Sequence, residues 1–259
     1  MNSIERVEVF SDTMKYCLKG YYFLNDKKIT INLPCKSKVY KSFININKKA
    51  NCEKTVVKVV NEDVLLTALK LKNEKPTILN MASGLNPGGA VESGAGSQEE
   101  YLCRCSSYYL SLSQCRPYYP LEKDFGGIYT EDVTVFRGPE EKEYPLLKDP
   151  FLVNMIAVPA ISNPIVQNEK LSPSDNRRTI NKIKTIFNIA IENNQEVLIL
   201  GAFGCGVFNN PPLIIANLFY EVLNLDAYKN AFSLIVFAIK EDSNSPKGGN
   251  YEPFKIVLS

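Results

Sequence analysis

Two adjacent glutamates, Glu99 and Glu100, follow a flexible linker at residues 94–96 and stand at the predicted start of a helix. Paired carboxylates suit general acid–base chemistry, because one group can protonate a leaving oxygen and then activate water. The ordinary structural explanation is a capping box, in which Ser97 caps the helix and Glu100 reaches back to its backbone N–H. That box explains Glu100 but neither Glu99 nor Gln98, so both interpretations stand.

A general acid at a helix start requires a bound ligand to raise the pKa of its carboxyl group. The helix dipole lowers the pKa of a carboxyl group in the first turn, whereas a general acid at neutral pH needs a raised pKa. Burial together with a nearby bound diphosphate would raise it, because both disfavour another negative charge. The pair therefore makes chemical sense with an anionic ligand in place.

Two glycine-rich loops, at residues 83–90 and 201–210, each follow a predicted strand and precede a predicted helix. Open α/β sheets bind ligands in such loops, where glycine lets backbone N–H groups converge on an anion. Neither loop has the Gly-Lys-Ser/Thr ending of a P-loop or the Gly-x-Gly-x-x-Gly spacing of a dinucleotide fingerprint. One such loop would be an ordinary turn; two together indicate a phosphate-containing nucleotide.

The composition excludes several kinds of catalytic and binding site. The chain has 259 residues, with 30 Lys and Arg, 28 Asp and Glu, and no histidine. Without histidine there is no Ser-His-Asp triad, Cys-His pair or histidine metal site, so a general acid must be Asp, Glu, Lys, Tyr or Cys. The net charge of +2 also argues against extended binding of a nucleic-acid backbone.

The cysteines and the N-terminal sequence indicate a cytoplasmic protein, or a nuclear one in a eukaryote. Seven cysteines without a visible secretory signal are typical of free thiols in a reducing compartment. Cys103 and Cys105 have the wrong spacing for zinc and no histidine completes a site, so we expect no metal. No apolar stretch is long enough to span a membrane.

Predicted strands and helices alternate along most of the chain, which indicates an α/β sheet sandwiched between helices. The expected strands span residues 55–60, 77–81, 133–136, 152–158, 197–200 and 234–239. The expected helices span residues 62–71, 177–193 and a segment that Asn210 caps and that ends near residue 224. Loops are expected at residues 139–150 and 243–252, and a separate helix at 5–18 and a hairpin turn at Asn25-Asp26.

The two loops and the glutamate pair resemble the microbial type of poly(ADP-ribose) glycohydrolase. Gly88-Gly89-Ala90, then seven residues, then Gln98-Glu99-Glu100 resembles that family's signature, in which three glycines precede Gln-Glu-Glu. The second loop is similar to the family's second loop from Gly201 to Pro211, and the resemblance covers roughly residues 55–240. It implies a macrodomain-like mixed sheet between helices, with an N-terminal extension (1–50) packed on the core and a catalytic domain (51–259).

The resemblance also implies an activity. The family cleaves ribose–ribose O-glycosidic bonds of poly(ADP-ribose) and releases ADP-ribose, without a metal or other cofactor. The implied partners are poly(ADP-ribose) or ADP-ribosylated protein and the ADP-ribose product, with no membrane and a monomeric chain. Two alternatives stay open: hydrolysis of mono-ADP-ribosyl groups or O-acetyl-ADP-ribose, and ADP-ribose binding without catalysis.

By the same resemblance, Glu100 is the acid/base and Glu99, with Gln98, holds the ribose hydroxyls and the geometry. Gly88, Gly89 and Ala90 would flank the diphosphate and the distal ribose. The backbone N–H groups of residues 204–207 would donate to the diphosphate, and Phe208 would pack against the distal ribose. The complete set of implied substrate-binding residues is Ser83, Gly88, Gly89, Ala90, Gln98, Gly204, Cys205, Gly206, Val207 and Phe208. Ala90 stands where the family has a third glycine. If that position needs a positive φ, alanine is strained; otherwise its methyl group only narrows the pocket.

Overall fold

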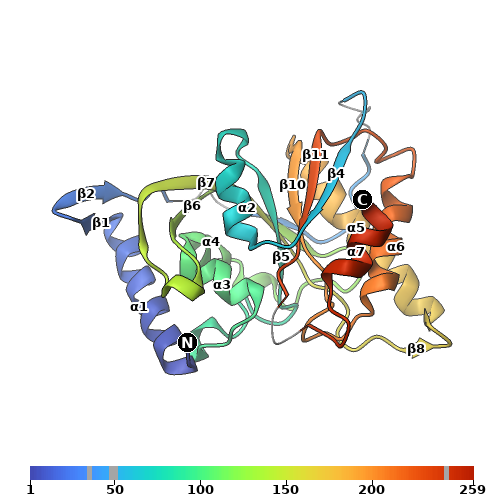
Figure 1. Ribbon diagram of the computed structural model, residues 1–259, viewed down its shortest axis with the longest axis horizontal. Helices are drawn as coiled ribbons and strands as arrows, with labels where there is room; N and C mark the ends of the chain where they lie inside the picture. Colours follow the sequence, from blue (N-terminus) through green and yellow to red (C-terminus); the bar gives the residue numbers. More distant parts are fainter. Residues whose placement is uncertain (34–36, 47–51, 242–244) are drawn as a thin grey trace.

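A seven-stranded mixed sheet forms the centre of the computed structural model, which describes residues 1–33, 37–46, 52–241 and 245–259 (Figure 1). The strands, in spatial order, are β3 (Lys38–Tyr40), β6 (Gly127–Arg137), β7 (Leu146–Val158), β5 (Thr77–Met81), β10 (Val197–Leu200), β11 (Leu234–Ala238) and β4 (Val56–Val60). The five strands from β7 to β4 run parallel. At one edge β6 pairs antiparallel with β7, and β3 pairs antiparallel with β6.

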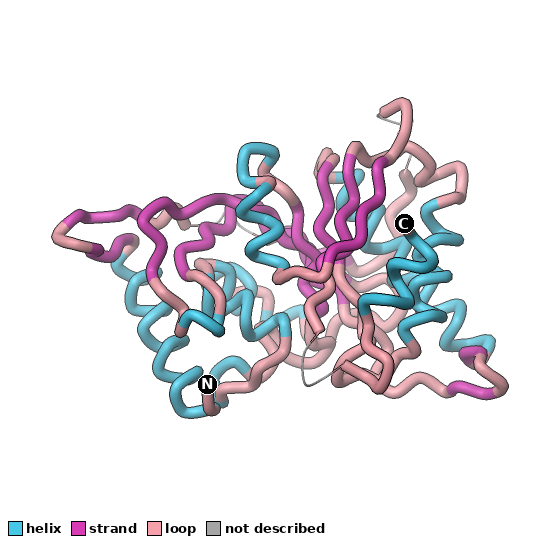
Figure 2. The backbone as a smooth tube through the Cα atoms, in the orientation of Figure 1, coloured by secondary structure: helices cyan, strands magenta, loops and turns pink. Residues whose placement is uncertain are grey.

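Helices cover both faces of this sheet (Figure 2). One core cluster joins it to α1 (Ser3–Lys19), α2 (Val64–Lys70), α3 (Gln98–Cys105) and α4 (Tyr108–Ser113). The other joins it to α5 (Pro173–Glu192), α6 (Pro212–Leu223) and α7 (Tyr251–Leu258). Strand alternation produces the two clusters: Ile78 of β5 belongs to the first and Leu79 to the second. The expected sheet sandwiched between helices is confirmed.

The shorter elements complete the chain. They are strands β1 (Tyr21–Leu24), β2 (Lys27–Thr30), β8 (Val166–Gln167) and β9 (Lys170–Leu171), and 3₁₀ turns η1 (Lys72–Glu74), η2 (Val91–Ser93), η3 (Arg116–Tyr118) and η4 (Glu140–Lys142). The predicted hairpin is confirmed: β1 and β2 pair across Asn25 and Asp26, which both take the positive φ that a tight turn needs.

Two of the expected loops are partly regular structure. β7 begins at Leu146, within the predicted loop 139–150, because its polar first half extends beside the end of β6. Its sequence there, Leu-Leu-Lys-Asp-Pro, lacks the alternation of apolar and polar residues that predicts a strand. α7 begins at Tyr251, inside the predicted loop 243–252, of which residues 243 and 244 lie outside the described part.

The described part of residues 1–50 contributes α1, the β1–β2 hairpin and β3, and β3 pairs with β6 of the central sheet. The division into an extension (1–50) and a catalytic domain (51–259) stays a prediction. Among the described residues, no helix combines the length and apolar character needed to span a membrane.

Candidate active site

The first turn of α3 is tied to the end of strand β5 by Gln98. The Met81 backbone N–H donates to Gln98 Oε1 over 2.9 Å, and Gln98 Nε2 donates to the Leu79 carbonyl over 2.8 Å. Both polar atoms of the amide are thereby occupied by the strand. Gln98 thus ties the start of α3 to strand β5, and this places the following glutamates at the carboxyl end of β5.

Glu99 is buried among hydrogen-bond donors. Its Oε2 accepts from the Ser83 N–H over 2.6 Å, and its Oε1 accepts from the Gly88 N–H and Asn80 Nδ2, each over 3.2 Å. Burial raises the pKa of Glu99 to about 8; these donors act against the shift and the neighbouring Glu100 carboxylate adds to it. The carboxyl group therefore connects three separate points of the strand and loop.

Glu100 presents one fixed and one unpartnered oxygen. The Ala90 N–H donates to its Oε1 over 3.0 Å, whereas its Oε2 is buried and has no hydrogen bond to any described residue. The capping-box interpretation is wrong, because the Ser97 side chain makes no capping hydrogen bond. Glu100 faces the glycine loop, where the loop's N–H satisfies one oxygen and leaves the other available to exchange a proton.

The first loop needs glycine at two positions. Gly88 and Gly89 have φ values of +76° and +59°, the left-handed region that glycine favours. A Cβ at Gly89 would lie 2.2 Å from Glu100 Oε1, and one at Gly88 would lie 2.6 Å from the Tyr109 ring. Ala90 has φ −114°, so alanine is unstrained there. Of the two possibilities for this departure from three glycines, the structure supports a methyl group that narrows a pocket.

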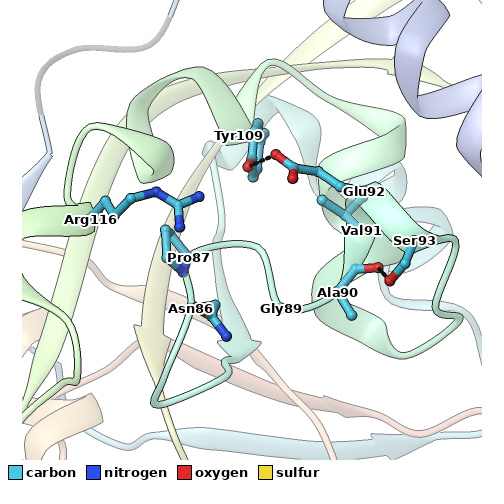
Figure 3. Close-up of a pocket in the computed structure, with 9 residues that line it drawn as sticks. All are labelled: Asn86, Pro87, Gly89, Ala90, Val91, Glu92, Ser93, Tyr109 and Arg116. Atoms are coloured by element: carbon cyan, nitrogen blue, oxygen red, sulfur yellow. Dashed lines mark hydrogen bonds between the residues drawn. The ribbon is translucent and has the colours of Figure 1, made fainter.

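That pocket has a volume of about 370 Å³ and lies against the outer part of the loop (Figure 3). It is lined by Asn86, Pro87, Gly89, Ala90, Val91, Glu92, Ser93, Tyr109 and Arg116. The Tyr109 hydroxyl donates to Glu92 Oε1 over 2.7 Å, whereas Arg116 has no ion pair with a described residue. Gly89 and Ala90 belong both to this wall and to the surroundings of Glu100.

The second loop follows β10, the strand beside β5, so both glycine loops leave the same edge of the sheet. Asn210 holds this loop: its Nδ2 donates to the carbonyls of Ile161, Gly204 and Phe208. The predicted N-cap is wrong, because Pro211 occupies that position. Gly204 has φ +74°, and its Cβ would lie 2.6 Å from the Asn210 amide.

Three consecutive N–H groups of the second loop, at residues 206–208, donate no hydrogen bond to the described chain. Successive backbone N–H groups without an acceptor in the chain can bind an anion. The N–H of Cys205, also expected to bind the diphosphate, donates instead to the Ala202 carbonyl over 3.0 Å. Its side chain is buried, and burial raises the pKa of the thiol. It is therefore a neutral loop residue and lacks the thiolate of a nucleophile.

Asn80 was missed as a site residue in the sequence. It is fully buried, and its Nδ2 donates to both Glu99 Oε1 and the Tyr108 hydroxyl, whereas its Oδ1 has no partner in the described chain. A signal was available: Asn80 is an amide within the largely apolar run Thr-Ile-Leu-Asn-Met of β5. A polar side chain buried in a strand usually bonds something specific.

Potential metal ligands do not gather in the described chain. No group of three or more His, Cys, Asp or Glu residues there is placed to hold a metal ion. The six described cysteines are unpaired; Cys35 lies outside the described residues.

Comparison with known proteins places these features in context. The sequence model of the microbial-type poly(ADP-ribose) glycohydrolase catalytic domain matches residues 11–138. The chain is similar to the structure of poly(ADP-ribose) glycohydrolase from Thermomonospora curvata bound to the inhibitor ADP-HPD, with 25% identity and a TM-score of 0.81, covering 97% of this chain and 98% of that one. No curated protein matched.

A second similar structure is poly(ADP-ribose) glycohydrolase from Deinococcus radiodurans in complex with ADP-ribose. The identity is 31% and the TM-score 0.68, and the alignment covers 80% of this chain and 85% of that one. The two structural alignments cover 97% and 80% of this chain, so the likeness extends beyond the residues that the family model matches.

Proposed function

The chain belongs to the microbial-type poly(ADP-ribose) glycohydrolase family, and on that premise we propose that it hydrolyses ribose–ribose O-glycosidic bonds of poly(ADP-ribose) and releases ADP-ribose. The observation that carries the proposal is the Glu100 carboxyl group, which has one oxygen fixed by the loop and the other unpartnered. A protein that only bound ADP-ribose would need no such group.

In the proposed reaction, Glu100 protonates the oxygen that leaves the anomeric carbon of the terminal ribose. The C–O bond breaks, its electron pair stays with the leaving oxygen, and an oxocarbenium-like centre forms. The Glu100 carboxylate then takes a proton from a water molecule whose oxygen bonds to the anomeric carbon. The Ala90 N–H keeps Oε1 in place, so that Oε2 performs both proton transfers.

We assign Glu99 to the organisation of the ribose site. Its carboxyl group already connects Ser83 and Gly88 through their N–H groups, so it holds the first loop in the shape that surrounds Glu100. Accepting hydrogen bonds from the ribose hydroxyls, as the family resemblance implies, would add to this role. Asn80 supports Glu99 from the strand side.

We assign the diphosphate to the second loop. The N–H groups of Gly206, Val207 and Phe208 have no other partner in the described chain and lie at the edge of the sheet from which the first loop also leaves. Phe208 would pack against the distal ribose. The net charge of +2 supports recognition of one or two terminal units rather than a long polymer groove.

One comparison of substrates tests the proposal. Auto-modified poly(ADP-ribose), a mono-ADP-ribosylated protein and O-acetyl-ADP-ribose are incubated with the protein side by side, and the ADP-ribose released from each is quantified. We expect the fastest release from the polymer. Faster release from either of the other two would assign the chain to the alternative hydrolase class, and binding without release from any substrate would make it a binding protein.

We also propose a cytoplasmic monomer. The six described cysteines are unpaired, which suits a reducing compartment. Size-exclusion chromatography with light scattering tests the monomer, for which the expected mass is 29.1 kDa.

A further inference from the structure

Arg104, four residues after Glu100 on α3, is fully buried and forms no ion pair with a described residue. Its Nε donates to the Tyr144 hydroxyl over 2.9 Å and its Nη1 to the Ala95 carbonyl over 2.7 Å, whereas Nη2 has no partner in the described chain. A buried cation is costly unless it is paired and hydrogen-bonded. A buried guanidinium group at this position therefore indicates a structural role that offsets its cost.

The counter-charge lies one hydroxyl group away, at Glu140. The Tyr144 hydroxyl donates to Glu140 Oε2 over 2.8 Å, so that Tyr144 connects Arg104 to the carboxylate. The other carboxylate oxygen, Oε1, accepts from Arg6 Nε and Nη2 over 3.0 and 2.8 Å. Although burial raises the pKa of Glu140, the hydrogen bonds from Arg6 and Tyr144 hold it below its usual value. Two guanidinium groups, one carboxylate and one neutral hydroxyl thus form a single hydrogen-bonded network.

This network encloses the linker at residues 94–96 that leads into the glutamate pair. A Cβ at Gly94 would lie 2.1 Å from the Ser3 carbonyl, and one at Gly96 would lie 2.6 Å from the Arg6 guanidinium. The linker is thus pressed between the start of α1 and the buried Arg104. Figure 1 shows the N-terminal end of α1 beside the segment that leads into α3.

The linker connects this network to the reacting carboxyl group. Arg104 holds the Ala95 carbonyl, the Ala95 N–H donates to the Ala90 carbonyl over 3.3 Å, and the Ala90 N–H donates to Glu100 Oε1. The Ala90–Ala95 contact closes the loop at its base. A loosened linker would therefore free the N–H that orients Glu100.

We propose that Arg104 is a positioning residue for Glu100, and that Arg6, Glu140 and Tyr144 complete the network through which it acts. Arg104 does not touch the substrate; it fixes the linker and, through Ala90, the orientation of the carboxyl group. The inference rests on the proposed function only in assigning Glu100 to proton transfer. The rigidity of the linker is a separate consequence that does not depend on the substrate.

The test uses Arg6, because it lies at the surface end of the network and its replacement leaves the core intact. Arg6→Met removes the two donors to Glu140 and keeps the aliphatic stem. We expect kcat for poly(ADP-ribose) to fall about tenfold with little change in KM, since misplacing a reacting group by 1 Å can cost roughly 10²-fold. Amide exchange of the peptide spanning residues 88–97, followed by mass spectrometry, should become faster.

Arg6→Lys is the graded variant: it keeps a charge but cannot donate two parallel hydrogen bonds, so its kcat should lie between wild type and Arg6→Met. Arg178→Met is the matched control, because the exposed fraction of the Arg178 side chain, 31%, is close to the 25% of Arg6 and its ion pairs with Asp124 and Asp175 lie elsewhere. It should leave kcat and exchange of residues 88–97 unchanged.

Tyr144→Phe removes the central hydroxyl and should reproduce the Arg6→Met pattern more strongly. The proposal is overturned if Arg6→Met and Tyr144→Phe lower the melting temperature but leave kcat and loop exchange equal to those of Arg178→Met. A failure of the proposed function looks different: wild type then releases no ADP-ribose from the polymer, whereas loop exchange still reports whether the network holds residues 88–97.

Discussion

Replacing Gly89 by alanine is a sharp test of the position of Glu100. The variant adds a single methyl group, and the structure places it 2.2 Å from Glu100 Oε1 and 3.1 Å from Glu99 Oε2. Because ordinary van der Waals contact begins near 3.4 Å, the carboxyl oxygen must retreat by roughly 1 Å. The φ of +59° adds strain of its own, since an L-residue in the left-handed region costs about 1–2 kcal/mol.

The two effects have different readouts. The backbone strain lowers the free energy of unfolding by about 1–2 kcal/mol, measured by urea denaturation. The displaced carboxyl group lowers kcat by about 10²-fold, because proton transfer depends on positions at this scale. Turnover of poly(ADP-ribose) and O-acetyl-ADP-ribose should fall alike, since Glu100 serves both.

Ala90→Gly is the matched control, because it removes a methyl group at the neighbouring position instead of adding one. Ala90 has a φ of −114°, so the alanine is unstrained and its removal relieves no strain. Glycine increases the conformational entropy of the unfolded chain, so the free energy of unfolding should fall by about 0.4–1 kcal/mol. Without the methyl group on the pocket wall, kcat/KM for poly(ADP-ribose) should rise several-fold, equivalent to about 1 kcal/mol. Turnover of O-acetyl-ADP-ribose and the affinity for free ADP-ribose should change less.

A Gly89→Ala protein that is folded and keeps more than about a third of wild-type kcat would refute the reasoning, because it would show that the acid does not lie against this glycine. Equal effects of Ala90→Gly on the two substrates would show that the methyl group is neutral toward the polymer.

Three further outcomes are expected. Glu100→Gln should bind ADP-ribose in calorimetry but keep less than about a tenth of wild-type turnover, because general acid catalysis is typically worth about 10²–10⁴-fold; higher residual activity would move the acid elsewhere. Gly206→Val should abolish ADP-ribose binding while the melting temperature stays near wild type, and unchanged affinity would reduce the second loop to a turn. Burial raises the pKa of Glu99 from 4.5 to about 8, so the unfolded chain binds fewer protons than the folded chain between these values and the free energy of unfolding falls as pH rises through this window. Glu99→Gln should flatten that part of the profile in urea denaturation at about pH 5 and 8, and a persistent slope would assign it to another group.

Local sequence patterns were sufficient for the alternating strands and helices and for the residue types of the site. The run Thr-Ile-Leu-Asn-Met contains no charged residue, which is typical of a central parallel strand, and β5 has the predicted bounds. Glycine-rich segments after strands identified both loops, because few other residues allow such turns. The glutamate pair was recognised from its types and its distance from the first loop.

Local patterns failed where a long-range contact competes with a local one. Ser97 and Glu100 have the spacing of a capping box, yet Glu100 bonds the Ala90 N–H, because folding of the glycine loop brings that donor to the start of α3. Asn210 likewise precedes two prolines as an N-cap would, but its side chain donates to two carbonyls of its own loop, at Gly204 and Phe208, and to the distant Ile161 carbonyl. In each case the side chain forms hydrogen bonds with backbone groups that the tertiary structure brings close to it.

Only the tertiary structure determined which distant segments support the site. The sheet order places β10 beside β5. Two loops that are more than a hundred residues apart in the sequence therefore lie at the same edge of the sheet. Arg6 and Glu140 are separated by 134 positions, and nothing in either local sequence relates them to Glu100. Hydrophobic periodicity encodes which face of an element is buried, but the partners of a buried charge depend on how the packed elements meet.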